Sequence, residues 1–393
     1  MLEQRQKCVL ILGANGRLGR AATQAFNEAG WEVLAQARQP VDSLPARARQ
    51  IGIDMANTDA IAKAAAGASA VVYAVNPLQT EWDKKLLPLA RKGMDVAQRL
   101  GALFMLPGNV YSYGEKMPLR LVESTVARPS NRKGELRAAL EEEMQTRITR
   151  GLRSVVIRAG DFYGAGVGNW FDQAVVKSLR SGKLVYPGPL DRVHAWAYLP
   201  DLARAFVGIA EHDLRRTLNA PVTRHALRAN GDVIGSFKKI HFAGHNVTGR
   251  DLLDAVERAA VRLQVATPGS LKRAGMLWSV IRLVGLVYPL WRELAKMAYL
   301  WRVPHTVESV VMNELLPELR NTPIEEATLA ALIDLGFGSP HSTSAAVSFF
   351  AESRASATSQ PHQPPNQHVN ERASPGLATP QTAAEVSLAR SVG

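Results

Sequence analysis

The stretch Cys8–Arg20 reads CVLILGANGRLGR, and it decides the fold of the N-terminal half. CVLIL is apolar throughout and has the length of a buried strand, and glycines follow at positions 13, 16 and 19. Leu18, Ala22 and Phe26 then recur at helical spacing, and a second apolar run, WEVLAQA, comes next. This order predicts a strand, a tight glycine turn, a helix and a second parallel strand.

The three glycines have distinct expected roles. Gly13 permits the turn, Gly16 lets the backbone approach a pyrophosphate, and Gly19 lets helix and strand pack closely. The helix N-terminus adds unpaired N–H groups and the positive end of a dipole. The motif therefore predicts a dinucleotide site, and a purely structural glycine turn is the alternative.

The same alternation continues along the chain. Further apolar runs are AVVYAV (70–75), ALFML (102–106) and LRSVVIR (152–158), and helical patterns lie at 57–66, 81–100 and 133–150. Short, fully apolar strands that alternate with helices indicate a parallel sheet covered on both faces. We predict an α/β fold with a doubly wound Rossmann-type parallel sheet.

The composition divides the chain into three parts. Residues 1–235 are predicted to form the nucleotide-binding domain. Residues 236–338 open with the strand-like FKKIHFAG, and Thr248 with Asp251 is expected to cap a helix; the part beyond, as far as Phe337, reads as helical without further strands. We interpret it as a smaller, mostly helical substrate domain. Residues 339–393, rich in Ser, Ala, Thr, Pro and Gln, are predicted to be a disordered tail.

Charge and cysteine content narrow the classes of function. The formal net charge is +12, but the basic residues are scattered, which favours a solvated surface suited to anionic ligands over nucleic-acid binding. The single cysteine, Cys8, indicates a reducing compartment, and no apolar signal region precedes it, so we expect a cytoplasmic protein. No metal site is expected.

One segment, MLWSVIRLVGLVYPLW (276–291), is strongly apolar. It is shorter than the roughly 20 residues that span a bilayer. Arg282 and Pro289 interrupt it. We therefore expect no transmembrane segment, and we interpret 276–291 as a buried or partner-facing helix.

The end of the second strand distinguishes NADP from NAD. An NAD site usually places an acid there for the ribose hydroxyls, whereas arginine suits a 2′-phosphate. This strand ends AQARQP, with Arg38 and no acid, so NADP is favoured over NAD, with Arg17 as a second contact. A solvated role for Arg38 is the alternative.

Several segments together resemble the extended and atypical short-chain dehydrogenase/reductase superfamily, of the NAD-dependent epimerase/dehydratase type. The resemblance covers about 7–338 and rests on GANGRLG, IDM (53–55), AVVYAVNP, VVIRAGDFYGAG and HAWAYLPDLARAF. With the reasoning above it implies the following cofactor contacts: Gly13, Asn15, Gly16, Arg17, Leu18, Gly19, Arg38, Asp54, Met55, Val75, Lys133, Arg158, Ala159 and Gly160. It also implies three residues on the substrate side: Tyr163, His194 and Trp196, of which a packed Trp and a hydrogen-bonded His are the ordinary alternatives.

The catalytic residues that the resemblance implies are Ser or Thr, Tyr, and a Lys four residues after the Tyr. Lys133 matches the Lys, but Pro129 stands at the Tyr position and the preceding strand ends in LPGN without a Ser pair. Tyr111 or Tyr113 could supply the proton, and Asn109 could orient the substrate oxygen, although a Tyr in such a loop more often packs.

Two functions follow from these patterns. The first is an NADP-binding oxidoreductase or epimerase that acts on an unidentified small molecule. The second is a dinucleotide-binding redox sensor without turnover, of the NmrA-like type, which the missing Tyr favours. A homodimer is compatible with both.

Overall fold

The computed structural model describes residues 7–219, 235–340 and 343–344. The chain divides into two units, Met1–Ser348 and Phe349–Gly393, and only the first contains described residues. Most of the tail predicted to be disordered, 339–393, therefore lies outside the described part.

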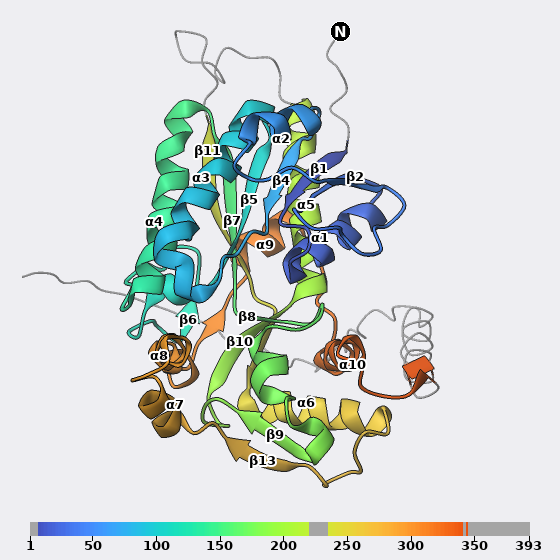
Figure 1. Cartoon of the computed structure of the whole chain (residues 1–393), viewed down its shortest axis with the longest axis vertical. Helices are drawn as coiled ribbons and strands as arrows, with labels where there is room; N and C mark the ends of the chain where they lie inside the picture. The colour runs from blue at the N-terminus through green and yellow to red at the C-terminus, as the bar shows by residue number, and fades with distance from the viewer. Residues whose placement is uncertain (1–6, 220–234, 341–342, 345–393) are drawn as a thin grey trace, which may run out of the picture. The chain divides into compact units, whose positions relative to one another are not determined.

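The first unit is built around a seven-stranded sheet in which every pair of neighbouring strands is parallel (Figure 1). Its spatial order is β11 (Ser236–Phe242), β7 (Arg153–Ala159), β5 (Leu103–Gly108), β4 (Ala70–Tyr73), β1 (Cys8–Leu12), β2 (Glu32–Gln36) and β3 (Ala48–Ile51). Every residue of β1 is buried, as its apolar sequence predicts for a strand covered on both faces. The predicted doubly wound Rossmann-type sheet is confirmed.

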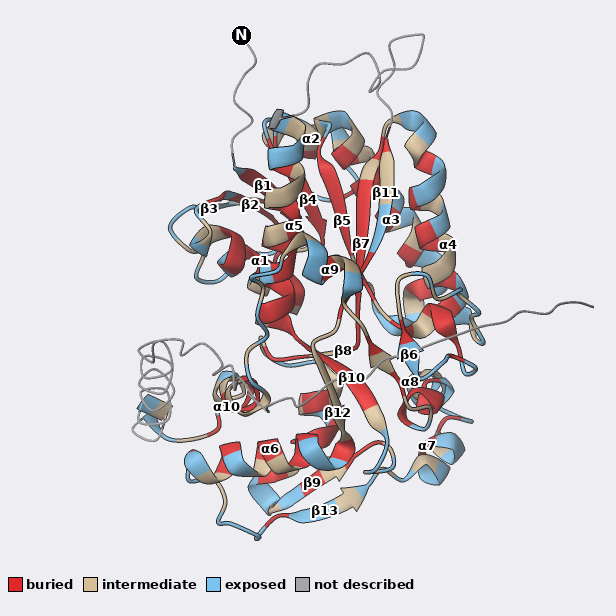
Figure 2. Ribbon diagram, turned by 180° about the vertical axis from the view of Figure 1, so that it is seen from behind, coloured by how far each residue is buried: buried red, intermediate tan, exposed pale blue. Residues whose placement is uncertain are grey.

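Helices cover both faces of this sheet, as Figures 1 and 2 show from opposite sides. One face carries α1 (Arg17–Glu28), α5 (Leu199–Asn219) and α9 (Val310–Leu315), and the other carries α2 (Thr58–Ala64), α3 (Trp82–Leu100) and α4 (Arg132–Thr146). Phe26 and Phe206 enter the first core, and Met94 and Leu140 enter the second. Apolar layers on both faces of the sheet therefore fix the interior strand β1, and the glycine turn follows directly from its carboxyl end.

The sheet extends past residue 235, because its outermost strand, β11, begins at Ser236. Before β11 the chain has already left the sheet to form β8 (Asp161–Tyr163), β9 (Lys183–Tyr186) and β10 (Val193–Tyr198). β8 and β10 form a separate three-stranded sheet with β12 (His245–Thr248). The chain thus crosses between the two regions more than once, and the division at 235 stays a prediction.

The C-terminal region is mostly helical, as predicted. It contains α6 (Gly249–Arg262), α7 (Trp278–Val284), α8 (Pro289–Lys296) and α10 (Ile324–Asp334). The capping box of Thr248 and Asp251 at the start of α6 is confirmed.

The expectation of no further strands beyond α6 was wrong. β13 (Lys272–Gly275) pairs with β9, and β14 (Thr306–Val307) pairs with β6 (Arg120–Leu121). These strands are too short to show an alternating pattern, and no residue of β13 is buried.

The interpretation of 276–291 as a buried helix was also wrong. The segment forms α7 and the start of α8, and Ile281 is the buried residue of α7. The partner-facing alternative remains. No helix among the described residues is long and apolar enough to cross a membrane.

Candidate functional site

A cleft of about 840 Å³ opens at the carboxyl ends of β1, β2, β4 and β5. This is where parallel α/β sheets bind ligands, and the volume lies within the usual range for such sites. Ten predicted site residues line it: Gly13, Asn15, Gly16, Arg17, Leu18, Arg38, Asp54, Met55, Val75 and Asn109.

The glycine turn leaves no room for side chains. Gly13 has φ +83°, and a Cβ there would lie 3.0 Å from the Val75 amide nitrogen. A Cβ on Gly19 would lie 2.3 Å from the Gly13 carbonyl oxygen. Gly16 caps α1 without any side-chain hydrogen bond, so no side chain competes for the N–H groups of the first turn. The turn therefore fits the phosphates of a dinucleotide.

Hydrogen bonds join the glycine turn to the end of β2. The Gly13 amide donates to the Gln36 carbonyl (3.1 Å), and Asn15 Nδ2 donates to the carbonyls of Gln39 and Pro40, each at 3.1 Å. These bonds fix the segment that presents exposed Arg38 to the cleft. The nearest acid beyond β3, Asp54, accepts a hydrogen bond from the Ala56 amide (2.7 Å).

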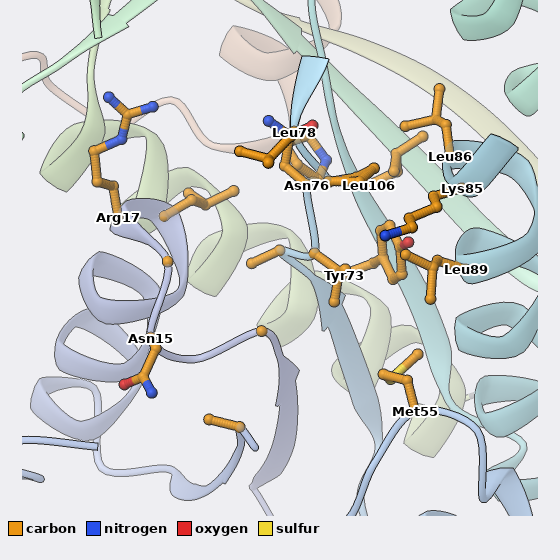
Figure 3. A pocket seen from close by; sticks show the side chains of 18 of the residues that line it. Asn15, Arg17, Met55, Tyr73, Asn76, Leu78, Lys85, Leu86, Leu89 and Leu106 are labelled. Atoms are coloured by element: carbon orange, nitrogen blue, oxygen red, sulfur yellow. The ribbon is translucent and has the colours of Figure 1, made fainter. Parts of the chain in front are cut away.

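Arg17 lies away from this end of the cleft. Figure 3 shows Arg17 and Asn15 leaving the turn in opposite directions, and it is Asn15 that bonds the segment around Arg38. Arg17 Nη1 is buried without a partner among the described atoms, 3.6 Å from the position of a Cβ on Gly168. Burial lowers the pKa of Arg17, and the charge of Asp172 opposes that shift. Because the Arg17 side chain points away from Arg38, the structure gives no support to the predicted contact between Arg17 and a 2′-phosphate.

On the opposite wall, Lys133 does not line the cleft. It is 4% exposed, donates to Gln79 Oε1 (2.7 Å) in the 3-10 helix η1 (Gln79–Glu81), and lies 3.5 Å from Glu293 Oε2 of α8. Arg137, one helical turn later, lines the cleft instead. It donates to the Pro107 carbonyl (3.3 Å), and its guanidinium lies 4.7 Å from the centroid of the Trp82 ring.

Sequence reasoning missed Arg137, which lines the cleft where Lys133 was expected. Lys133 and Arg137 are one helical turn apart on α4, and no local pattern indicates which of the two basic side chains reaches the cleft. Arg137 Nε is buried without a partner among the described atoms, which leaves a donor for a ligand. Tyr73 was missed as well: it lines the cleft, and its buried hydroxyl also lacks a described partner.

The structure separates the two candidate tyrosines. Tyr113 is buried and its hydroxyl lies 2.8 Å from His241 Nε2 of β11. Tyr111 is half-buried, its ring centroid lies 6.4 Å from that of Trp82, and its amide N–H donates to Asn109 Oδ1 (3.1 Å). Burial raises the pKa of Tyr111, the charge of Asp161 adds to this, and Arg137 opposes it. Tyr111 is therefore the tyrosine on the Arg137 side, although it does not line the cleft itself.

Arg158, Ala159 and Gly160, which were predicted to contact the cofactor at the end of β7, are instead surrounded by other parts of the protein. Arg158 is 2% exposed and its Nε donates to Glu141 Oε1 (2.9 Å), while its guanidinium lies 4.6 Å from the Tyr113 ring centroid. A Cβ on Gly160 would lie 2.0 Å from the Ala195 carbonyl oxygen, because β7 crosses close to β10 there. Arg158, Ala159 and Gly160 do not line the cleft.

The three predicted substrate-side residues are packed in the smaller region. Tyr163 is buried with its hydroxyl 3.1 Å from His245 Nδ1. His194 Nε2 lies 2.8 Å from Asp161 Oδ2, and its ring stacks on Trp301 with centroids 4.3 Å apart. Trp196 is fully buried. The ordinary alternatives, a packed Trp and a hydrogen-bonded His, describe these positions.

No group of three or more His, Cys, Asp or Glu able to hold a metal occurs in the part of the chain that the structure describes.

Residues 9–220, more than half of the chain, match the model of the NAD dependent epimerase/dehydratase family. The chain belongs to this family. Within it, solved structures share the fold at low identity, and no curated protein sequence matches significantly.

Three solved structures illustrate the likeness. A UDP-glucose 4-epimerase aligns with TM-score 0.61 and 16% identity over 84% of this chain and 99% of its own. MoeE5, solved with UDP-glucose and NAD, aligns with TM-score 0.58 and 16% identity over 83% of this chain and 97% of its own. WbmH from Bordetella bronchiseptica, solved with NAD+, aligns with TM-score 0.58 and 15% identity over 84% and 98%. At these identities the likeness shows the epimerase/dehydratase fold alone.

Proposed function

We propose that this chain binds NADP in the cleft and acts as an oxidoreductase or epimerase on a small molecule. The proposal rests mainly on the residues at the end of β2. Arg38 lines the cleft there, and the segment from Gln36 to Pro40 contains no acidic residue. A guanidinium binds phosphate through two parallel hydrogen bonds, and an acid would repel it. MoeE5 was solved with NAD and UDP-glucose, which supports sugar nucleotides as the first substrates to try.

The cofactor assignment is tested by titrating NADPH and NADH against the protein. We expect NADPH to bind about tenfold or more tightly, because a hydrogen bond to a charged group contributes roughly 1.5–3 kcal/mol. Arg38→Ala should remove most of the difference. Arg47→Ala, which removes an exposed arginine outside the cleft, should leave it unchanged. Equal affinities in the unmodified protein would overturn the assignment.

A bound nicotinamide supplies hydride transfer. The side chains of the protein would then have to supply or accept the proton at the substrate oxygen. Burial raises the pKa of Tyr111, so its hydroxyl stays protonated and is available as a hydrogen-bond donor to a substrate oxygen on the Arg137 side. Asn109 orders the Tyr111 backbone, and Arg137 offers its free donor at the same wall of the cleft.

The proton donor is tested with Tyr111→Phe, which removes only the hydroxyl. We expect kcat to fall about 100-fold or more with NADPH affinity unchanged, since general acid catalysis typically contributes 10²–10⁴. Tyr113→Phe is the matched control and should change kcat little. The assay must follow sugar products as well as NADPH, because an epimerase shows no net oxidation. Full activity in Tyr111→Phe would contradict the role.

The sensor alternative rests on a specific observation. Lys133 is held by Gln79 and Glu293 outside the cleft, and α4 contains no tyrosine. NADPH binding without turnover on a panel of aldehydes, ketones and nucleotide sugars would favour the sensor over the enzyme.

We also propose a cytoplasmic location. The single cysteine, Cys8, is buried in β1, and burial raises its pKa to about 11, so its thiol stays protonated. A lone cysteine forms no intrachain disulfide, which fits a reducing compartment.

A further inference from the structure

The α7–α8 hairpin, residues 277–296, carries more than half of the exposed large hydrophobic side chains among the residues that the structure describes. Of the thirteen large hydrophobic side chains that are exposed there, seven lie within 277–291. The most exposed are Leu277, Leu283, Leu286, Val287 and Tyr288, with Val287 at 73%. Figure 2 shows α7 largely in the colour of exposed residues, at the periphery of the smaller region. Contiguous apolar surface of this kind marks an interaction site.

The backbone N–H groups at the tip of this hairpin are already hydrogen-bonded within the hairpin. The amides of Gly285, Leu286, Val287 and Tyr288 all donate to carbonyls of α7, at 2.9–3.1 Å. Pro289 opens α8 and has no N–H. A backbone with its donors paired internally can enter a medium without water at little cost.

Arg292 completes this arrangement. Its Nε and Nη2 donate to the carbonyls of Gly285 and Leu286, each at 3.0 Å, where α7 ends. Those carbonyls would otherwise face solvent at a helix C-terminus. The hairpin therefore presents apolar side chains on a closed backbone.

The inner side of the hairpin is fixed to the protein. Ile281 is buried, and Trp278 Nε1 donates to the Pro187 carbonyl (2.6 Å). Glu293 lies 3.5 Å from the buried Lys133. The exposed apolar side chains are thus held outward on a fixed base.

The charge along the hairpin is mainly basic. From residue 272 to 302 the sequence has six basic residues (Lys272, Arg273, Arg282, Arg292, Lys296 and Arg302) and one acidic residue, Glu293, a net of +5. Arg273 pairs with Asp254 and Glu257, and Lys296 pairs with Glu293. Lys272 and Arg282 are exposed, and neither has an ion-pair partner among the residues that the structure describes. An isologous contact with a second copy would bring like charges together. The complementary surface is anionic.

We propose that the α7–α8 hairpin docks on the surface of an anionic phospholipid bilayer. Leu283, Leu286 and Val287 enter the boundary between headgroups and acyl chains, and Lys272 and Arg282 face the lipid phosphates. Aromatic side chains such as Tyr288 and Trp291 are the residues that membrane interfaces favour. Apolar insertion combined with basic charge is the pattern of proteins that lie on a membrane without crossing it.

The test is co-sedimentation of the full chain with phosphatidylcholine vesicles that contain roughly one third phosphatidylserine. We expect most of the protein to sediment with these vesicles and little with phosphatidylcholine alone. Leu286→Ser/Val287→Ser and, separately, Lys272→Gln/Arg282→Gln should each weaken binding about tenfold. Both pairs change exposed side chains, so the melting temperature should not move.

Matched controls change the same chemistry elsewhere. Leu119→Ser/Val126→Ser removes two exposed apolar side chains, and Lys84→Gln/Lys116→Gln removes two exposed charges; neither should affect binding. Failure of the unmodified protein to sediment with anionic vesicles would overturn the proposal. So would equal binding by the hairpin variants, or self-association in ultracentrifugation that Leu286→Ser/Val287→Ser abolishes.

Discussion

The two walls of the cleft are built in different ways. The glycine turn after β1 is shaped by its backbone. Gly13, Gly16 and Gly19 let backbone segments approach so closely that an added Cβ would contact them. The wall formed by α4 and the segment after β5 is shaped by side chains. There Lys133 and Arg137 point to different places although one helical turn separates them.

We therefore assign cofactor binding mainly to the glycine turn and the chemistry of the reaction to the side chains of the opposite wall. A backbone site accepts any dinucleotide phosphate, because N–H groups are the same in every residue. A side-chain site depends on partners that are distant in the sequence, such as Gln79 and Glu293 for Lys133 or Glu141 for Arg158. Substitutions on the second wall therefore test whether a charged residue serves the cofactor or the fold.

The largest effect is expected from Glu141→Leu. It leaves the guanidinium of Arg158, at 2% exposure, without its carboxylate, and breaking a buried ion pair typically costs 3–5 kcal/mol. We expect the free energy of unfolding in urea to fall by about 4 kcal/mol. Glu142→Leu, the exposed neighbour on α4, should change it little.

The double variant Glu141→Leu/Arg158→Met sharpens this test. Replacing both charges should recover most of the stability, because no buried charge is left unpaired. NADPH affinity should stay close to that of the unmodified protein. A large loss of affinity in the folded double variant would show that Arg158 contacts the cofactor after all.

A smaller effect is expected on the backbone wall from Gly19→Ala. In most helices this change stabilises, but here the new Cβ would lie 2.3 Å from the Gly13 oxygen and 2.8 Å from Ala14 Cα. We expect a loss of roughly 2–3 kcal/mol in unfolding free energy and weaker NADPH binding, as the turn is forced open. Gly52→Ala, where no atom lies within 4 Å of the Cβ, is the control. An unchanged stability in Gly19→Ala would remove the packing role.

The sequence predicted the backbone wall well for a physical reason. The closely spaced glycines lie directly between an apolar run and a helical pattern, and CVLIL and AVVYAV have the length and the β-branched content of buried strands, so several local signals agree there. The small sheet of β8, β10 and β12 was not predicted, because its strands are short and their neighbours are remote in sequence. For the same reason nothing local distinguished Arg137 in the cleft from Lys133 beside it.

The side-chain contacts of the second wall were equally hidden. Tyr113 and Tyr111 stand two residues apart in NVYSYG, yet one meets His241 of β11 and the other lies on the Arg137 side. Which tyrosine lies on the Arg137 side depends on the 3-10 turn η2 (Tyr111–Tyr113) that joins them. A pattern of residue types cannot encode that direction.

The smallest effect is a pH dependence that tests the structural role of Tyr113. Burial, the largest cause, lowers the pKa of His241 from its ordinary 6.5 to about 4; Arg158 and Lys239 add to this, and Glu123 opposes it. Between these values the unfolded chain binds a proton that the folded chain does not. The free energy of unfolding therefore falls as pH falls from about 6.5 toward 4, by up to ~1.4 kcal/mol per pH unit.

His241→Gln removes this titration. We expect urea unfolding at pH 7 and pH 5 to differ by roughly 2 kcal/mol less in the variant than in the unmodified protein. His305, with a pKa lowered to about 3 by burial, is retained and keeps its own slope in both proteins. An unchanged difference would mean that the pKa of His241 in the fold is close to its ordinary 6.5. A loss of kcat at constant NADPH affinity would instead make the Tyr113–His241 pair part of proton transfer, and would remove the contrast between the two tyrosines.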